Sequence, residues 1–176
     1  MINKPMPTKN STAPVYWITG LSGSGKSTLG ELLYQFLQGK NPATVYLDGD
    51  ILRQVYGDHG GHDLNSRKMI AGKNARLCKL LSDQGIQVVI ATISLFHEVQ
   101  QWNRANIENY TEIFLNPPQS VIEARCSKGL YQKNIQNMVG KDLKAEYPLQ
   151  ADLTYDTSKL TPQQILDDIL SSQSIN

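Results

Sequence analysis

The stretch GLSGSGKST, from Gly20 to Thr28, contains the residue types that can hold a chain of phosphates. Gly20, Gly25, Lys26 and Ser27 fit the spacing G-x-x-x-x-G-K-[ST]. In such a loop, backbone N–H groups point at phosphate oxygens and the following helix contributes its positive N-terminal end. Lys26 would reach the β- and γ-phosphates, and the Ser27 hydroxyl would bind Mg²⁺. The alternative is a Gly/Ser-rich turn that only joins a strand to a helix. We predict a loop that binds ATP through Gly20, Ser22, Gly23, Ser24, Gly25, Lys26, Ser27 and Thr28.

Two carboxylates follow the next apolar run, in the sequence Leu47-Asp48-Gly49-Asp50. Beside a phosphate-binding loop, one carboxylate can bind Mg²⁺ through water while the other orients or deprotonates an attacking hydroxyl. We predict the metal role for Asp48 and the catalytic role for Asp50. The alternative is that Asp48 closes the strand with an Asx turn, since Asp-Gly is a common turn pair.

Arginines and a serine are further candidates for contacts with an anion. Arg53 lies one helical turn beyond Asp50, where its guanidinium could grip a phosphate bidentately. Arg67 and Arg104 are weaker candidates, because exposed arginines on helices usually do no more than solvate a surface. Ser94 directly follows an apolar run that is typical of a buried central strand.

The elements that must position these residues alternate along the chain. Apolar runs predict strands at 14–19, 43–47, 86–93, 111–115 and 151–155. Helical spacing predicts helices at 26–38, 51–56, 65–85, 95–109, 117–126 and 165–171, the last opened by a capping box from Thr161 to Gln164. This alternation is typical of a three-layer α/β/α sandwich with a mainly parallel sheet, which binds ligands beyond the carboxyl ends of its strands.

Length and composition indicate one domain without extended charged surfaces. The chain has 176 residues and a net charge of +1, so nothing indicates binding to nucleic acid or an anionic membrane. Residues 1–13 lack the apolar core of a signal peptide and are expected to form a flexible tail before a domain at 14–176. The two cysteines lack metal-binding spacing and suit a reducing cytoplasm. The polar segment 127–148 is expected to form a partly helical, mobile lid over ATP. The oligomeric state is left open, a homodimer included.

Taken in order, these motifs resemble the adenylylsulfate kinase family. The resemblance rests on WITGLSGSGKST, LDGD with Arg53, the strand ending ATIS, then KGLY and GKD, and it covers about Trp17 to Asp156. It implies a P-loop kinase fold and transfer of the γ-phosphoryl of ATP, with Mg²⁺, to the ribose 3′-hydroxyl of adenylylsulfate. The partners would then be ATP and a small nucleotide acceptor.

The resemblance also implies roles for single residues. The two aspartates of the family's DGD segment match Asp48 and Asp50, and its next two arginines match Arg53 and Arg67. The family's serine after the central strand matches Ser94, which would be either a phosphoserine intermediate or, in direct in-line transfer, a substrate contact. Three sets of residues complete the implied substrate site: Ile93 with Ser94, Lys128 of KGLY, and the positions His62 and Met138 discussed next.

Six positions depart from the family's pattern, and two of them, Cys126 and Ser127, replace an aspartate and a proline before KGLY. His62 and Met138 stand where the family has phenylalanines that stack on the adenine of adenylylsulfate, Ile70 replaces an asparagine, and His97 replaces an arginine. Base stacking contributes ~1–3 kcal/mol per base, so these changes make another base an open alternative, although His62 could still stack. Relatives of the family that phosphorylate cytidine diphosphoramidate for surface polysaccharides supply that alternative acceptor.

A nucleotide-hydrolysing switch protein is a hypothesis from another class. The sequence speaks against it, because it has no N-K-x-D segment for guanine and Ser94 stands where a switch protein would usually carry a Walker B aspartate. We therefore predict a kinase acting on a small nucleotide derivative.

Overall fold

The computed structural model describes residues 12–57, 63–126, 140, 144–173 and 175. The side chain of Cys126 is not part of this description. Of the predicted site residues, His62, Lys128 and Met138 lie outside it, as do most of the tail and most of the segment predicted as a lid. Residues 140 and 144–148, the described part of that segment, contain no helix or strand, and the partly helical lid stays a prediction for the rest of it.

Five parallel strands form one sheet in the order β2-β3-β1-β4-β5. Their bounds are β1 Val15–Gly20, β2 Thr44–Asp48, β3 Gln87–Ala91, β4 Tyr110–Leu115 and β5 Leu153–Tyr155. Every residue of β1 and β3 is buried, as expected for strands covered on both faces. The predicted parallel sheet is therefore confirmed.

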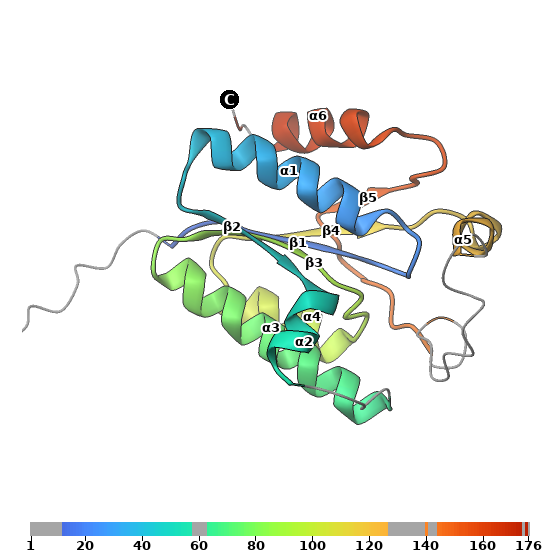
Figure 1. The fold of residues 1–176 in the computed structure, drawn as a ribbon, viewed down its shortest axis with the longest axis horizontal. Helices are drawn as coiled ribbons and strands as arrows, with labels where there is room; N and C mark the ends of the chain where they lie inside the picture. Colours follow the sequence, from blue (N-terminus) through green and yellow to red (C-terminus); the bar gives the residue numbers. More distant parts are fainter. Residues whose placement is uncertain (1–11, 58–62, 127–139, 141–143, 174, 176) are drawn as a thin grey trace, which may run out of the picture.

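Helices cover both faces of the sheet (Figure 1). α1 Lys26–Lys40 and α6 Pro162–Ser172 lie on one face. α2 Gly49–Val55, α3 Leu64–Asp83 and α4 His97–Asn106 lie on the other, and α5 Gln119–Cys126 follows β4. These three layers are those of the predicted α/β/α sandwich.

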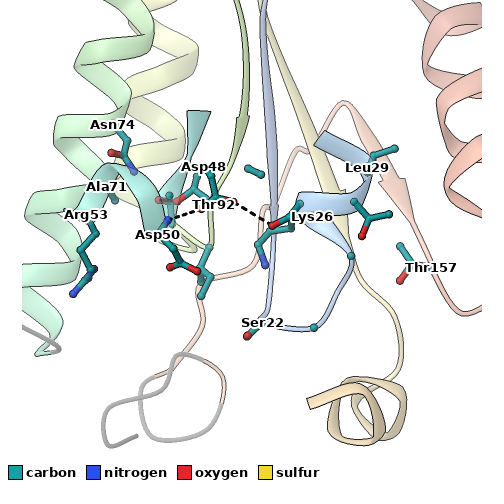
Figure 2. Close-up of a pocket in the computed structure, with 18 of the residues that line it drawn as sticks. Ser22, Lys26, Leu29, Asp48, Asp50, Arg53, Ala71, Asn74, Thr92 and Thr157 are labelled. Atoms are coloured by element: carbon teal, nitrogen blue, oxygen red, sulfur yellow. Dashed lines mark hydrogen bonds between the residues drawn. The ribbon is translucent and has the colours of Figure 1, made fainter. Parts of the chain in front are cut away.

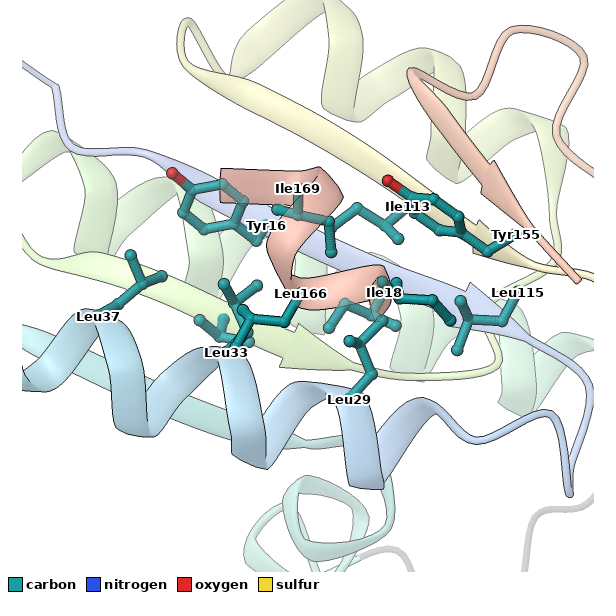
Figure 3. Close-up of a cluster of buried hydrophobic side chains, with 12 residues drawn as sticks. Tyr16, Ile18, Leu29, Leu33, Leu37, Ile113, Leu115, Tyr155, Leu166 and Ile169 are labelled. Carbon is teal, nitrogen blue, oxygen red and sulfur yellow. The ribbon is translucent and has the colours of Figure 1, made fainter. Parts of the chain in front are cut away.

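The face beneath α1 and α6 is packed with apolar side chains (Figure 3). Leu29, Leu33 and Leu37 recur every four residues along α1, so they form one apolar stripe. Leu166 and Ile169 of α6 pack into the same cluster. This packing holds the start of α1 at the end of β1, where the phosphate-binding loop lies.

Small residues of α3 pack against the opposite face. Ala71, Ala75 and Cys78 are buried with Trp17 and Ile90 of the central strands. Because these side chains are short, α3 runs close to the sheet. Its N-terminal half therefore lies near the carboxyl ends of β2 and β3.

Several element ends differ from the sequence expectation. β3 ends at Ala91, and α4 begins at His97 rather than 95, because the chain makes a tight loop in which Ser94 has a φ of 28°.

The predicted capping box of Thr161 and Gln164 is present at the start of α6. Ala13, assigned to the tail, is buried and hydrogen-bonded to Ser82 through its backbone. No described helix is long and apolar enough to cross a membrane.

Candidate active site

A pocket of about 540 Å³ lies at the carboxyl ends of β1, β2 and β3 (Figure 2). It brings together most of the predicted site residues from four separate segments of the chain. They are Ser22, Gly23, Gly25, Lys26, Ser27, Thr28, Asp48, Asp50, Arg53, Arg67, Ile93 and Ser94. Gly20 and Ser24, by contrast, are not among the residues that line the pocket. Ser24 is wholly buried, and Gly20 packs against β4.

The loop between β1 and α1 depends on glycine conformations. Gly20, Gly23 and Gly25 have φ values of 151°, 81° and 98°, which other residues rarely adopt. A Cβ atom on Gly20 would lie 2.5 Å from the carbonyl oxygen of Leu115. The Lys26 ammonium donates to the carbonyl oxygen of Leu21 at 2.7 Å, so its side chain folds back along the loop. The backbone thus forms the curled loop that the spacing predicted.

Asp48 joins the loop to the second strand. Its Oδ1 accepts hydrogen bonds from the N–H groups of Asp50 (2.8 Å) and Ile51 (3.3 Å), which caps α2. Its Oδ2 accepts from the Ser27 hydroxyl at 3.2 Å. The predicted turn is therefore present, because one oxygen caps α2, while the other oxygen faces the loop; the metal role of Asp48 stays a prediction. The cap fixes the carboxylate in the orientation that a metal site beside Ser27 would need.

Gly49 lets α2 start directly against the end of β3. A Cβ atom there would lie 2.9 Å from the Thr92 hydroxyl and 3.3 Å from the carbonyl oxygen of Ala91. This close approach brings Asp50 and Arg53 of α2 into the pocket wall.

Two guanidinium groups and one carboxylate form the wall opposite the loop. The pKa of Arg67 is lowered, first by burial and then by the like charge of Arg53, while Asp50 acts in the opposite direction. Arg53, Arg67 and Asp50 are therefore close enough to interact. Two cations on one half-buried wall are suited to bind an anionic group.

Ser94 lies in the loop between β3 and α4. Its side chain is 6% exposed, and its hydroxyl oxygen is 2.9 Å from that of Thr92. The loop is held by hydrogen bonds from the Thr19 hydroxyl to the carbonyl oxygen of Ile93 and from the Phe96 N–H to that of Ser94. These bonds keep Ser94 at the edge of the pocket.

The structure adds pocket residues that we did not predict: Asn74, Thr92, Phe96, Arg125 and Thr157. Arg125 of α5 donates to the carbonyl oxygens of Gly23 and Thr157, and the Thr157 hydroxyl donates to that of Ser24. These bonds brace the phosphate-binding loop against the chain that follows β5. Thr157 could have been found from its place just after a predicted strand, whereas no local pattern marks Arg125.

Besides Gly20 and Ser24, two residues singled out in the sequence, His97 and Arg104, are not among those lining the pocket. The His97 ring is 2.9 Å from the carbonyl oxygen of Tyr147, and the backbone N–H of His97 donates to the Glu146 carboxylate. Arg104 pairs with the buried Glu112 and with Asp152, and it also donates to the carbonyl oxygen of Gln150. Arg104 therefore has a structural role, whereas Ile70, which is 5% exposed, does line the pocket.

Asp48 and Ser27, whose side-chain oxygens are 3.2 Å apart, are the residues predicted to hold a metal ion. In the described part of the chain, no three histidine, cysteine, aspartate or glutamate side chains gather into a metal site. Mg²⁺ usually takes one or two carboxylates and completes its shell with water and substrate phosphates, so the pair of Asp48 and Ser27 suits it.

Residues 12–156 match the adenylylsulphate kinase family. The chain belongs to this family. A cytidine diphosphoramidate kinase of Campylobacter jejuni is 41% identical to this chain over 148 residues, which cover 82% of this chain and 86% of that protein. An adenylyl-sulfate kinase of Pseudomonas aeruginosa is 35% identical over 174 residues, covering 96% and 89% of the two chains.

A solved relative has the same fold. The structure of the Mycobacterium tuberculosis APS kinase in complex with AMPPNP and APS matches with a TM-score of 0.83 and 27% identity, over 94% of this chain and 99% of that one. As a member of the adenylylsulphate kinase family, the chain is a P-loop kinase: it uses ATP as a phosphoryl donor and a hydroxyl group as acceptor.

Proposed function

We propose that this kinase transfers the γ-phosphoryl of ATP to the ribose 3′-hydroxyl of a small nucleotide derivative with an anionic tail, such as adenylylsulfate. The observation that supports this is a single pocket with two unlike walls. One wall is the phosphate-binding loop with Lys26 and Ser27, and the other carries Asp50, Arg53 and Arg67. A pocket that binds a triphosphate on one side and an anion beside a carboxylate on the other suits phosphoryl transfer between two nucleotides.

The donor wall would stabilise the transferring phosphoryl group. The loop N–H groups, the N-terminal end of α1 and the Lys26 ammonium would hold the triphosphate and its developing charge. Asp48 and Ser27, whose oxygens are 3.2 Å apart, would bind Mg²⁺ together with phosphate oxygens. When bound, the ion would neutralise charge on the β- and γ-phosphates.

The acceptor wall would align the hydroxyl that attacks. Asp50 would accept the proton of the 3′-hydroxyl or orient it, while Arg53 and Arg67 would hold the anionic tail. Ser94 would contact the acceptor from the edge of the pocket, and Ile93 would lie beside it. His62, Lys128 and Met138 remain proposals for the acceptor site that rest on the sequence resemblance.

Cytidine diphosphoramidate is a second candidate acceptor. Its support is the 41% identity to a relative with that activity in its name, together with the apolar Ile70 in the pocket wall where the family pattern has asparagine. In that case the same residues would perform the same transfer on a different nucleotide, in the modification of surface polysaccharide.

The test is to measure ADP release by the purified chain with ATP and Mg²⁺, in separate reactions with adenylylsulfate, cytidine diphosphoramidate and other nucleotide diphosphates. We expect one acceptor to give the highest kcat/KM and its product to carry phosphate on the 3′-oxygen. The proposal fails if no small acceptor stimulates ADP release. Hydrolysis that requires a protein partner would then support a switch protein.

A further inference from the structure

Asn74 is a buried polar residue at the back of the pocket. It lies on α3, one turn beyond Ile70 and two turns beyond Arg67, and it is 1% exposed. Its Oδ1 has no hydrogen-bond partner among the residues that the structure describes. In Figure 2, Asn74 and Ala71 project from α3 on the side that faces Asp48. The side chain is therefore both unsatisfied and part of the pocket wall.

Asn103 provides a comparison within the same helical layer. It lies on α4, is also wholly buried, and its Oδ1 also has no partner among the described residues. However, its Nδ2 donates to the Tyr110 hydroxyl at 3.3 Å, so the rest of the protein fixes its side chain. Asn103 is not among the pocket residues. Asn74 differs because it lies beside a cavity that a ligand can fill.

A buried amide oxygen without a donor destabilises the fold, because it has lost its hydrogen bond to water. A leucine of similar size would avoid that cost in a pocket that is also lined by the apolar residues Ile70, Ala71 and Phe96. The polar group is explained if a ligand supplies the missing donor. The carboxamide can rotate so that Oδ1 faces the pocket, since its oxygen and NH₂ ends are similar in shape.

We propose that Asn74 is a specificity-determining residue, which accepts a hydrogen bond from an N–H group of the acceptor nucleotide. This inference rests on the proposed function. The N–H group can belong to a phosphoramidate tail or to the exocyclic amine of the base. A sulfate tail has oxygens only and cannot donate to Oδ1. Asn74 would therefore favour acceptors that place an N–H group against this part of α3.

The test compares wild type with Asn74→Leu, using kcat/KM for cytidine diphosphoramidate, cytidine diphosphate and adenylylsulfate. We expect the variant to lose about tenfold or more in kcat/KM for the preferred acceptor, because a site built for a polar group discriminates strongly once that contact is lost. The Tm of the free protein should stay the same or rise, because the unsatisfied amide is gone. A loss confined to cytidine diphosphoramidate assigns the N–H group to the tail. A loss shared with cytidine diphosphate, or seen with adenylylsulfate, assigns it to the base.

Asn103→Leu is the matched control. It removes an equally buried amide outside the pocket, so it should lower the Tm and leave the ratio of kcat/KM values between acceptors unchanged. The inference is overturned if Asn74→Leu leaves kcat/KM unchanged for every acceptor, as expected for an asparagine that only holds a buried water. The proposed function would still stand in that case. If wild type phosphorylates none of the acceptors, the proposed function fails and the inference fails with it.

Discussion

The two walls of the pocket are built in different ways. The donor wall is mostly backbone: a glycine loop braced by Arg125 and Thr157, with the Asp48 carboxylate fixed by its own cap. The acceptor wall consists of side chains on α2 and α3, among them Arg53, Arg67 and Asn74. Under the proposed function this difference has a reason: triphosphates share the same charged groups, so a backbone loop would suffice to bind them, whereas acceptors differ and would be distinguished by side chains.

The largest expected effect comes from Asp50→Asn, which removes the carboxylate of the acceptor wall. Loss of the proton acceptor should lower kcat by about 10²- to 10⁴-fold, while ATP binding stays nearly unchanged because the donor wall is intact. Steady-state kinetics and nucleotide titration would measure both. Asp167→Asn, on the exposed surface of α6, is the control and should have no effect. Full turnover by Asp50→Asn would remove this carboxylate from the mechanism.

The same contrast explains which parts of the site were predictable. The glycines, Lys26 and Ser27 are recognisable because a phosphate-binding loop requires a fixed local spacing. The turn at Asp48 was predictable from its place at a strand end, and the structure shows that this turn and the contact with Ser27 coexist. The sheet and its layers were likewise predictable from the apolar runs.

Other parts depend on contacts between distant segments. Arg125 reaches Gly23 across 102 positions of sequence, and nothing in the neighbourhood of either residue signals that contact. Asn74 belongs to an ordinary helical pattern, and only the packing of α3 shows that it is buried beside the pocket. The end of β3 was misjudged because the apolar run continues through Thr92 and Ile93 into a loop. The start of α4 was misjudged because Leu95 and Phe96 are buried in that loop without being in a helix.

Gly20→Ala tests whether the donor wall depends on its backbone. The added Cβ would meet the carbonyl oxygen of Leu115 at 2.5 Å, and the φ of 151° is strained for alanine. We expect a loss of about 2–4 kcal/mol in the free energy of unfolding, measured by denaturant titration. Gly39→Ala is the control: no other atom lies within 4 Å of the point where its new Cβ would sit on α1, so it should stabilise the protein by about 0.5–1 kcal/mol. Equal stabilities for the two variants would contradict the argument.

Arg67→Lys tests whether the acceptor wall depends on side-chain shape. Lysine keeps the charge but loses the planar fork that binds an anion through two hydrogen bonds. We expect the KM for the acceptor to rise about tenfold, with little change in kcat or in the KM for ATP. Arg76→Lys, on the same helix but stacked on Trp102, should leave both constants unchanged. A rise in the KM for ATP instead would place Arg67 on the donor side.

The smallest effect is expected for Ser94→Ala, which distinguishes direct transfer from a phosphoserine intermediate. The Ser94 hydroxyl is buried against Thr92, and Asp50 lies in the same pocket to activate the acceptor hydroxyl. Transfer can then pass directly from ATP to the acceptor, and the loss of one hydroxyl contact should lower kcat/KM by about tenfold or less. Mass spectrometry of wild type incubated with ATP alone should find no phosphate on Ser94. Complete loss of activity in Ser94→Ala, together with a phosphorylated Ser94 in wild type, would instead show that the phosphoryl group passes through a phosphoserine intermediate at this residue.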